Sequence, residues 1–354
     1  MPSGAGNIAL DLPAGASGPW RLLVPSGLDR RAGAAEDSVV SWVDVRPDGD
    51  NIVMDCGQDE TGQCATQFRL QGLPKDAARL TVDLDARVAY LPHLLGDAFT
   101  LLNLDGDFGP EIAESRIGGS GQNPVLFSSF NKRFFGGFAA AVRPCDPAAP
   151  PAVTLGCTRP LIYVTQRFWP GIRPLSFNPG LKQIVAFSGL SAIRLQDIDP
   201  EDEKMIGDRP LTGDLVFEDP AGDRLLLVHT TPPAIARIDT SLGPTGDPLN
   251  AEVAIIPLCR NPNLLALYQP KTEESLAFVS CYSDSQVAVV ALATFTAVAT
   301  LEVEAGPNEL IVDAARRKLY VVHTQASTIG VVELDTKSPD YLHIIGRVGL
   351  AGDE

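Results

Sequence analysis

The last third of the chain contains a unit of four short apolar segments, and this unit restricts the fold more than any other feature. The segments lie between Gly306 and Gly349, are rich in β-branched residues and end at turn-forming residues. They cover residues 310–312, 319–322, 329–334 and 342–348. Segments of this kind predict four consecutive β-strands joined by tight turns.

The same pattern returns upstream, which makes the chain a repeat protein. Residues 261–306 and 209–240 contain it clearly. A weaker form, in which at least a pair of strands is recognisable, covers 20–25 with 37–47, 80–106, and 160–166 with 171–177. The 32 Gly and 29 Pro among 354 residues also favour many short strands over long helices.

The C-terminal unit resembles the YVTN β-propeller repeat. The residues that carry the resemblance are Pro307, Asp313, "LYVV" at 319–322, "VVEL" at 331–334 and "RVG" at 347–349. It extends over nearly the whole chain, strongly over 209–349 and weakly before. Because this repeat is a packing pattern, the resemblance implies a fold and no particular activity.

The six units predict an all-β chain that forms a single closed β-propeller of four-stranded blades. Six blades are the first choice, and seven the second, because the spacing is loosest around 106–205. An apolar segment at about 7–12 has no partner in this arrangement. We expect it to complete the C-terminal blade and close the ring, which removes an exposed sheet edge. Residues 1–354 would then form one domain.

The net charge of −16 bears on the partners of the chain. Such an acidic surface repels nucleic acid and anionic lipid, but leaves cationic ligands, basic proteins and divalent metals open. The longest uncharged stretch, 285–301, is too short to span a bilayer comfortably, so the chain is predicted not to be transmembrane. Residues 1–6 contain no export signal. We interpret the chain as a mature form whose leader has been removed, which leaves a lipid anchor open.

Six cysteines fall into three local couples, and none forms a C-x-x-C motif. The couples predict three disulfides in an oxidising compartment, whereas the alternative is buried thiols in the cytosol. The predicted bridges are Cys56–Cys64, Cys145–Cys157 and Cys259–Cys281. The third is supported by the blade pattern, since Cys259 precedes the innermost strand of its blade and Cys281 ends the second strand. Both positions lie on the same face of a blade.

The chain contains four histidines, of which His229 and His323 end the second strand of their blades. At the opening of a propeller channel, neutral imidazoles can bind a metal or a ligand. His93 is placed one residue later in its blade, and the other blades are aligned with Pro25, Thr165 and Ser280 at this position. The alternative is that each histidine only bonds the neighbouring backbone. Because a catalytic zinc needs three protein ligands, no catalytic metal is predicted here.

Oxygen-bearing side chains recur in the third strands. Asp44, Asn103, Asp239 and Glu333 are aligned with one another, and a structural role, in which they accept turn N–H groups, is preferred to a metal ring. A second group consists of Asn103, Asp105, Asp107 and Glu111, whose spacing suits calcium. A plain acidic turn is the preferred interpretation there, with a calcium ion as the alternative, and no other cofactor is predicted.

The sequence contains no G-x-S-x-G, P-loop, H-E-x-x-H or dinucleotide-binding motif. We therefore expect a non-enzymatic extracytoplasmic propeller of a bacterial envelope, which acts as an assembly subunit or interaction platform for a protein partner. The alternative is a propeller enzyme or a binder of a metal or cofactor, such as a lactonase-like hydrolase or a dehydrogenase subunit. Its site would lie at the channel mouth, near His229 and His323.

Overall fold

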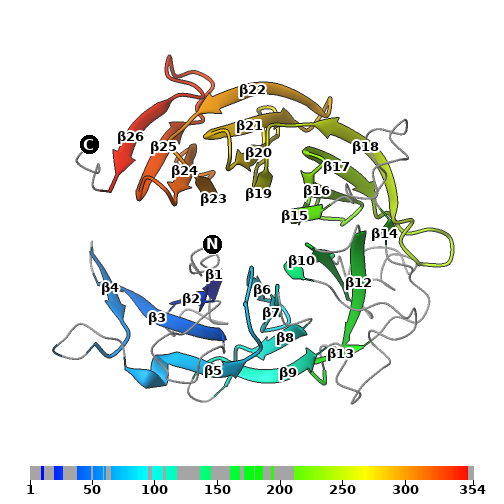
Figure 1. Cartoon of the computed structure of the whole chain (residues 1–354), viewed down its shortest axis with the longest axis vertical. Helices are drawn as coiled ribbons and strands as arrows, with labels where there is room; N and C mark the ends of the chain where they lie inside the picture. The colour runs from blue at the N-terminus through cyan, green and yellow to red at the C-terminus, as the bar shows by residue number, and fades with distance from the viewer. Residues whose placement is uncertain are drawn as a thin grey trace. The chain divides into compact units, whose positions relative to one another are not determined.

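The computed structural model describes most of the strands and the turns between them. The described residues are 9–11, 20–26, 38–48, 51–58, 60, 65–94, 98–106, 109–117, 136–144, 160–167, 171–178, 180–185, 193–194 and 211–349. They form six antiparallel sheets, each with a path of four strands. The fold is an all-β, six-bladed β-propeller, as predicted from the repeats (Figure 1). Among the described residues, helical structure is confined to the 3-10 turn Thr66–Phe68.

The chain divides into two compact units, and the first contains three blades. Each blade runs from its innermost to its outermost strand in chain order. The strands of the first unit are β1 (Ala9–Asp11), β2 (Trp20–Ser26), β3 (Ser38–Asp48), β4 (Asn51–Asp55), β5 (Arg69–Leu73), β6 (Thr81–Asp83), β7 (Val88–Pro92), β8 (Ala98–Asn103), β9 (Glu111–Ile117), β10 (Gly137–Val142), β11 (Leu161–Gln166), β12 (Gly171–Asn178) and β13 (Gln183–Val185). Both β4 and β5 pair with the long β3, at its two ends.

The N-terminal strand does not complete the C-terminal blade, so that prediction is wrong. Strand β1 pairs with β2 as the innermost strand of the first blade, with Ala9 opposite Leu23 and Asp11 opposite Arg21. Asp11 is buried and accepts a hydrogen bond of 2.6 Å from Arg87 of the second blade. This ion pair favours the position of β1 in the first blade, which the apolar residues of the strand alone do not indicate. Closure of the ring and a single domain stay predictions.

The second unit contains the other three blades, in which every residue from 211 to 349 is described. Its strands are β14 (Ile193–Arg194), β15 (Leu211–Phe217), β16 (Arg224–Thr231), β17 (Ala234–Asp239), β18 (Ala251–Pro257), β19 (Pro262–Tyr268), β20 (Leu276–Cys281), β21 (Gln286–Ala291), β22 (Thr296–Glu302), β23 (Pro307–Asp313), β24 (Lys318–His323), β25 (Thr328–Glu333) and β26 (Ile344–Val348). The blades are β15–β18, β19–β22 and β23–β26.

The core of the second unit lies between neighbouring blades. Phe278 and Val289 of one blade pack with Leu319 and Val321 of the next, and all four side chains are fully buried. Such sheets bury both faces, which explains why their strands are almost continuously apolar rather than alternating. The apolar runs that the sequence repeats are therefore the contacts between blades.

The strand register confirms three members of the predicted row of oxygen-bearing side chains. Asn103, Asp239 and Glu333 each lie opposite the residue at which the pairing with the second strand begins, whereas Asp44 lies one position further along, opposite Arg21. Three of them accept a hydrogen bond from the backbone N–H two residues ahead: Asn103 from Asp105, Asp239 from Ser241 and Glu333 from Asp335. The row therefore stabilises turns, as preferred from the sequence.

The Cys259–Cys281 disulfide is present, with 5.8 Å between the Cα atoms. Cys56 is also disulfide-bonded. Its backbone oxygen accepts a hydrogen bond of 3.0 Å from the N–H of Ala65. Cys64, Cys145 and Cys157 lie outside the described residues, so the Cys56–Cys64 and Cys145–Cys157 pairings stay predictions.

In the described part of the chain, no helix has the length and apolar character needed to cross a membrane.

Candidate functional site

The register places three histidines at one repeat position. His93, His229 and His323 each lie five residues after the point where the pairing between second and third strand begins, at Val88, Arg224 and Lys318. The predicted offset of His93 by one residue is therefore wrong. In two other blades the aligned residues are likewise Gln166 and Cys281 rather than Thr165 and Ser280, whereas Pro25 lies at its predicted position. Apolar runs have no internal marker of register, which is why the alignment by sequence slipped.

His93 is a histidine of the core. Its ring is fully buried, with Nδ1 3.2 Å from the backbone oxygen of Lys75 and Nε2 2.9 Å from Oγ1 of Thr100. Burial lowers the pKa of His93 to about 4, so the ring is neutral at physiological pH. Both nitrogens have partners, and this histidine serves the packing of its blade.

His229 is also fully buried, but neither of its ring nitrogens has a hydrogen-bond partner among the described residues. Oε2 of Glu252 lies 4.0 Å from Nε2, which is too long for a hydrogen bond. The residue opposite His229 on the neighbouring strand is Ala234, whereas Thr328 lies opposite His323. Burial lowers the pKa of His229 to about 4. Because Ala234 has no hydroxyl group, the ring nitrogens of His229 lack the partner that Thr328 provides for His323.

Replacing Ala234 by Thr should therefore stabilise the protein relative to Ala234→Val. Thr and Val have the same shape, so the comparison isolates the hydroxyl group. We expect the Thr variant to exceed the Val variant by about 1 kcal/mol in free energy of unfolding, measured with denaturant, because the hydroxyl bonds a buried ring nitrogen. Equal stabilities of the two variants would contradict this explanation.

His323 has a different environment from the other two. Its side chain is 1% exposed, and its Nδ1 lies 3.1 Å from Oγ1 of Thr328 and 3.7 Å from Oε2 of Glu304. The Thr328 hydroxyl donates a hydrogen bond to the same Glu304 oxygen. Nε2 of His323 is buried and has no hydrogen-bond partner among the described residues. One ring nitrogen is thus held in place, while the other has no hydrogen-bond partner among the described residues.

The charges around His323 come from two other elements. Glu304 lies on the crossover between β22 and β23, and its Oε1 forms an ion pair of 2.8 Å with Nε of Arg347 on β26. Burial lowers the pKa of His323 most strongly, the Glu304 carboxylate raises it and Arg347 lowers it, and the net direction is down. A neutral imidazole with a carboxylate beside Nδ1 is suited to accept a proton at Nε2.

Sequence analysis did not identify Glu304, Thr328 or Arg347. No local pattern marks them, because they come from a crossover, a third strand and an outermost strand. The structure joins them to His323, whereas a common site of His229 and His323 stays a prediction. The described part of the chain also contains no group of three His, Cys, Asp or Glu side chains that could hold a metal ion.

The predicted calcium residues are partly described, since Asp107 lies outside the described residues. Asn103 donates a hydrogen bond of 2.6 Å to Glu111, and Asp105 accepts one of 2.8 Å from Nε of Arg87. The Lys182 ammonium donates a hydrogen bond to Asn103 and lies 3.5 Å from Asp105. The Arg87 and Lys182 cations hold the pKa of the Asp105 carboxyl below its usual value, against its partial burial. These contacts agree with the preferred acidic turn, and a calcium ion stays a prediction.

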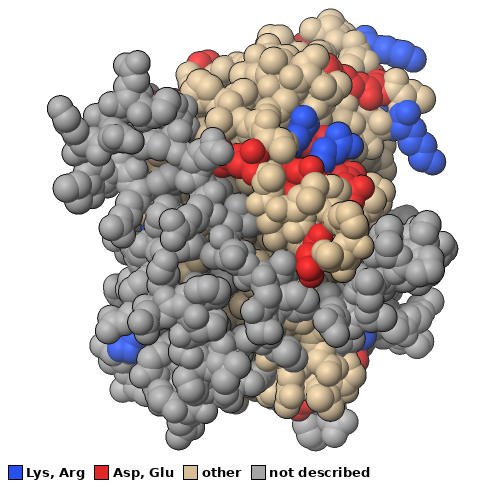
Figure 2. Space-filling model, turned by 90° about the vertical axis from the view of Figure 1, so that its right-hand side faces the viewer, with Lys and Arg blue, Asp and Glu red and all other residues tan. Residues whose placement is uncertain are grey.

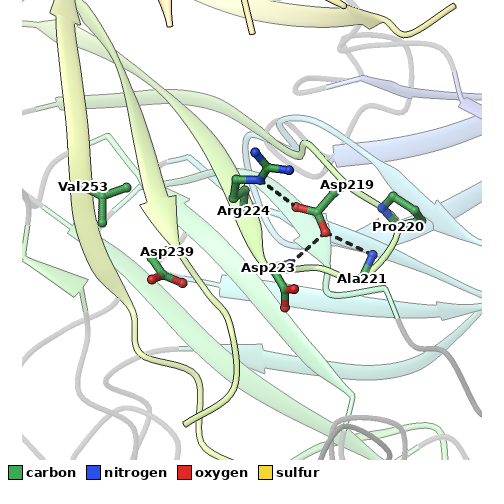
Figure 3. A pocket seen from close by; sticks show the side chains of 7 residues that line it. All are labelled: Asp219, Pro220, Ala221, Asp223, Arg224, Asp239 and Val253. Carbon is green, nitrogen blue, oxygen red and sulfur yellow. Dashed lines mark hydrogen bonds and ion pairs between the residues drawn. The ribbon is translucent and has the colours of Figure 1, made fainter. Parts of the chain in front are cut away.

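An open groove of about 560 Å³ lies on the blade β15–β18, lined by Asp219, Pro220, Ala221, Asp223, Arg224, Asp239 and Val253 (Figure 3). The Asp219 carboxylate accepts hydrogen bonds from the N–H groups of Ala221 and Asp223 and pairs with Arg224. Asp239 is one of the turn-stabilising row. Figure 2 likewise shows acidic and basic side chains next to one another on the described surface. The polar groups of this groove are thus engaged in the turn itself.

Comparison with solved structures shows where this fold has been found. The protein resembles a proposed 6-phosphogluconolactonase from Bacteroides fragilis, with 13% identity and a TM-score of 0.62 over 96% of this chain and 83% of that one. It also resembles the periplasmic gluconolactonase PpgL from Pseudomonas aeruginosa, with 12% identity and a TM-score of 0.62 over 94% and 83% of the two chains. No family model matches the sequence. No curated protein matches it in sequence either.

These likenesses correct the predicted function. The sequence was interpreted as a non-enzymatic interaction platform, because it contains no recognised catalytic motif. Structures that share the fold over nearly the whole chain are instead described as lactonases. Enzymes on a repeat scaffold assemble their sites from single residues of separate strands, so the absence of a local motif does not exclude catalysis.

Proposed function

We propose that the protein is a lactonase-like hydrolase in which His323 acts as general base. The observation that carries the proposal is the contrast between the two ring nitrogens of His323. Nδ1 lies beside Thr328 and Glu304, whereas Nε2 has no partner among the described residues. The lactonase names of the similar structures support this class of reaction.

The reaction follows from the chemistry of an ester in a ring. A water molecule attacks the lactone carbonyl carbon while Nε2 of His323 takes one of its protons. The C–O bond of the ring then breaks, and the ring oxygen receives the proton from the imidazolium. The product is the open-chain hydroxy acid. Glu304, 3.7 Å from Nδ1, stabilises the imidazolium that exists between the two proton transfers.

The charges favour an uncharged lactone over a phosphorylated one. The net charge of −16 repels anions at a distance. Arg347 already binds Glu304 at 2.8 Å, and Arg260, at the same end of the neighbouring blade, binds Asp284 at 2.7 Å. A phosphate group would have to displace a carboxylate from either cation. The substrate is therefore proposed to be a neutral sugar-type lactone.

Hydrolysis of paired substrates tests both the reaction and this preference. Acid release from an uncharged aldonolactone and from its phosphorylated counterpart should be followed at low and at high salt. We expect kcat/KM for the uncharged lactone to be at least about tenfold higher at low salt, with a smaller ratio at high salt, because salt screens the repulsion. Equal or faster turnover of the phosphorylated lactone would contradict the preference. Turnover of neither would contradict the proposed function.

The proposed location is outside the cytoplasm. The Cys259–Cys281 bridge supports an oxidising compartment. The similar gluconolactonase from Pseudomonas aeruginosa is described as periplasmic. Membership of the YVTN repeat family, a protein partner and a lipid anchor also remain proposals, which rest on the sequence alone.

A further inference from the structure

We propose that Thr328, Glu304 and Arg347 form a positioning chain that holds His323 in the tautomer with its hydrogen on Nδ1 and its lone pair on Nε2. The proposal deepens the proposed function, because this tautomer matters for hydrolysis only if Nε2 is the base. The positioning chain consists of four side chains, each in contact with the next: His323, Thr328, Glu304 and Arg347.

The direction of each hydrogen bond follows from the number of hydrogens available. An ionised carboxylate only accepts hydrogen bonds, so the Thr328 hydroxyl must give its single hydrogen to Oε2 of Glu304. The hydroxyl oxygen can then only accept at its other contact, 3.1 Å from Nδ1 of His323. Nδ1 therefore carries the hydrogen. In a neutral ring, Nε2 is left with the lone pair.

Arg347 keeps Glu304 in the state that this chain requires. Its Nε forms an ion pair of 2.8 Å with Oε1 of Glu304, which leaves Oε2 for Thr328. The crossover that carries Glu304 is tied on both sides by backbone hydrogen bonds, Val303 N to Ser285 O at 3.0 Å and Thr324 N to Gly306 O at 2.9 Å. The carboxylate is therefore presented from a fixed segment, and Arg347 orients its end.

The other histidines of the same repeat position lack this arrangement. In His93, Nε2 is engaged with Thr100, so no ring nitrogen is left over. In His229, the residue in the place of Thr328 is Ala234. Gly330 also belongs to the His323 environment, since a Cβ there would lie 3.0 Å from Cε1 of the ring. The environment of His323 thus differs from its repeat equivalents in the features that select a tautomer.

The test is a titration of the histidine ring nitrogens by ¹⁵N NMR, on the full chain and on three variants. In the unsubstituted protein, we expect the His323 signals of the Nδ1–H tautomer. Thr328→Val should abolish the preference for this tautomer. Arg347→Met should raise the pKa of His323, because a nearby cation that lowers it is removed, and Arg347→Lys should restore the original value. For Thr328→Val, kcat/KM should fall about 10–100-fold, the usual cost of losing a partner that orients a functional histidine.

Arg347 is 63% exposed on the outermost strand, so its variants are expected to fold. An Nε2–H tautomer in the unsubstituted protein would overturn the positioning chain, even if lactones are hydrolysed. An unchanged or lowered pKa of His323 in Arg347→Met would overturn the role of Arg347. If the NMR results are as expected and no lactone is hydrolysed, the positioning chain is supported and the proposed function is contradicted.

Discussion

Replacing His323 by Gln is expected to lower kcat/KM for lactone hydrolysis about 10²–10⁴-fold, the usual contribution of a general base. Gln has a similar volume and can keep one hydrogen bond to Thr328, but it cannot take a proton from water. The loss should therefore appear mainly in kcat, while the KM for the lactone changes little. Steady-state kinetics with the uncharged lactone measure both values.

The pH dependence follows from the same residue. The net effect of the surroundings of His323 is to lower its pKa, with burial as the largest cause. A base must be neutral to act, so activity should rise as pH increases through this lowered pKa and should persist at pH values where an ordinary histidine is protonated. The acidic limb of the kcat/KM profile should disappear in His323→Gln.

Two control variants separate this role from general damage. His343 is in the same blade and exposed, with Nδ1 2.9 Å from the backbone oxygen of Tyr341. His343→Gln should leave kinetics and stability unchanged. His229→Gln tests the other histidine considered from the sequence. If His229→Gln abolishes hydrolysis while His323→Gln does not, the candidate site has been assigned to the wrong blade.

Replacing Arg237 by Met is expected to have the largest effect on stability. The Arg237 guanidinium bonds both oxygens of Glu218, at 2.8 and 2.9 Å, and also donates to the backbone oxygen of Leu292 in the next blade. Its guanidinium lies 4.3 Å from the centre of the Phe295 ring. Without Arg237 the buried Glu218 carboxylate loses its main partner, at a cost of about 3–5 kcal/mol in free energy of unfolding.

Arg224 reduces this cost, because its Nη1 lies 3.6 Å from the same carboxylate. Glu218→Gln combined with Arg237→Met should therefore be less destabilising than the sum of the two single variants, since no charge is left buried. Arg316→Met is the matched control. It breaks an ion pair of 2.7 Å with Asp313 on the exposed surface and should leave the free energy of unfolding nearly unchanged. Denaturant unfolding of the unsubstituted protein and the four variants checks this order of stabilities, and additive effects of Glu218→Gln and Arg237→Met would contradict the prediction.

Local sequence was sufficient for the fold class, the number of blades and one disulfide. Strands such as β20 and β24 are short, rich in residues that favour strands, and bounded by turns. These features depend only on neighbouring residues. The Cys259–Cys281 bridge could be predicted because strand order alone brings its ends to one face. The turn-stabilising row was predictable for the same reason, since Asn103, Asp239 and Glu333 each bond a backbone group two residues away.

Tertiary structure decided the place of the first strand, the register of the histidines and the composition of the candidate site. An apolar segment can pair with any unpartnered sheet edge, and tertiary contacts such as the Asp11–Arg87 ion pair place this one in the first blade. A register shift by one residue costs little in an apolar run, so His93 could not be aligned from sequence. Glu304 and Arg347 are brought to the His323–Thr328 pair from a crossover and an outermost strand, and contacts of this kind leave no periodic signal in the sequence.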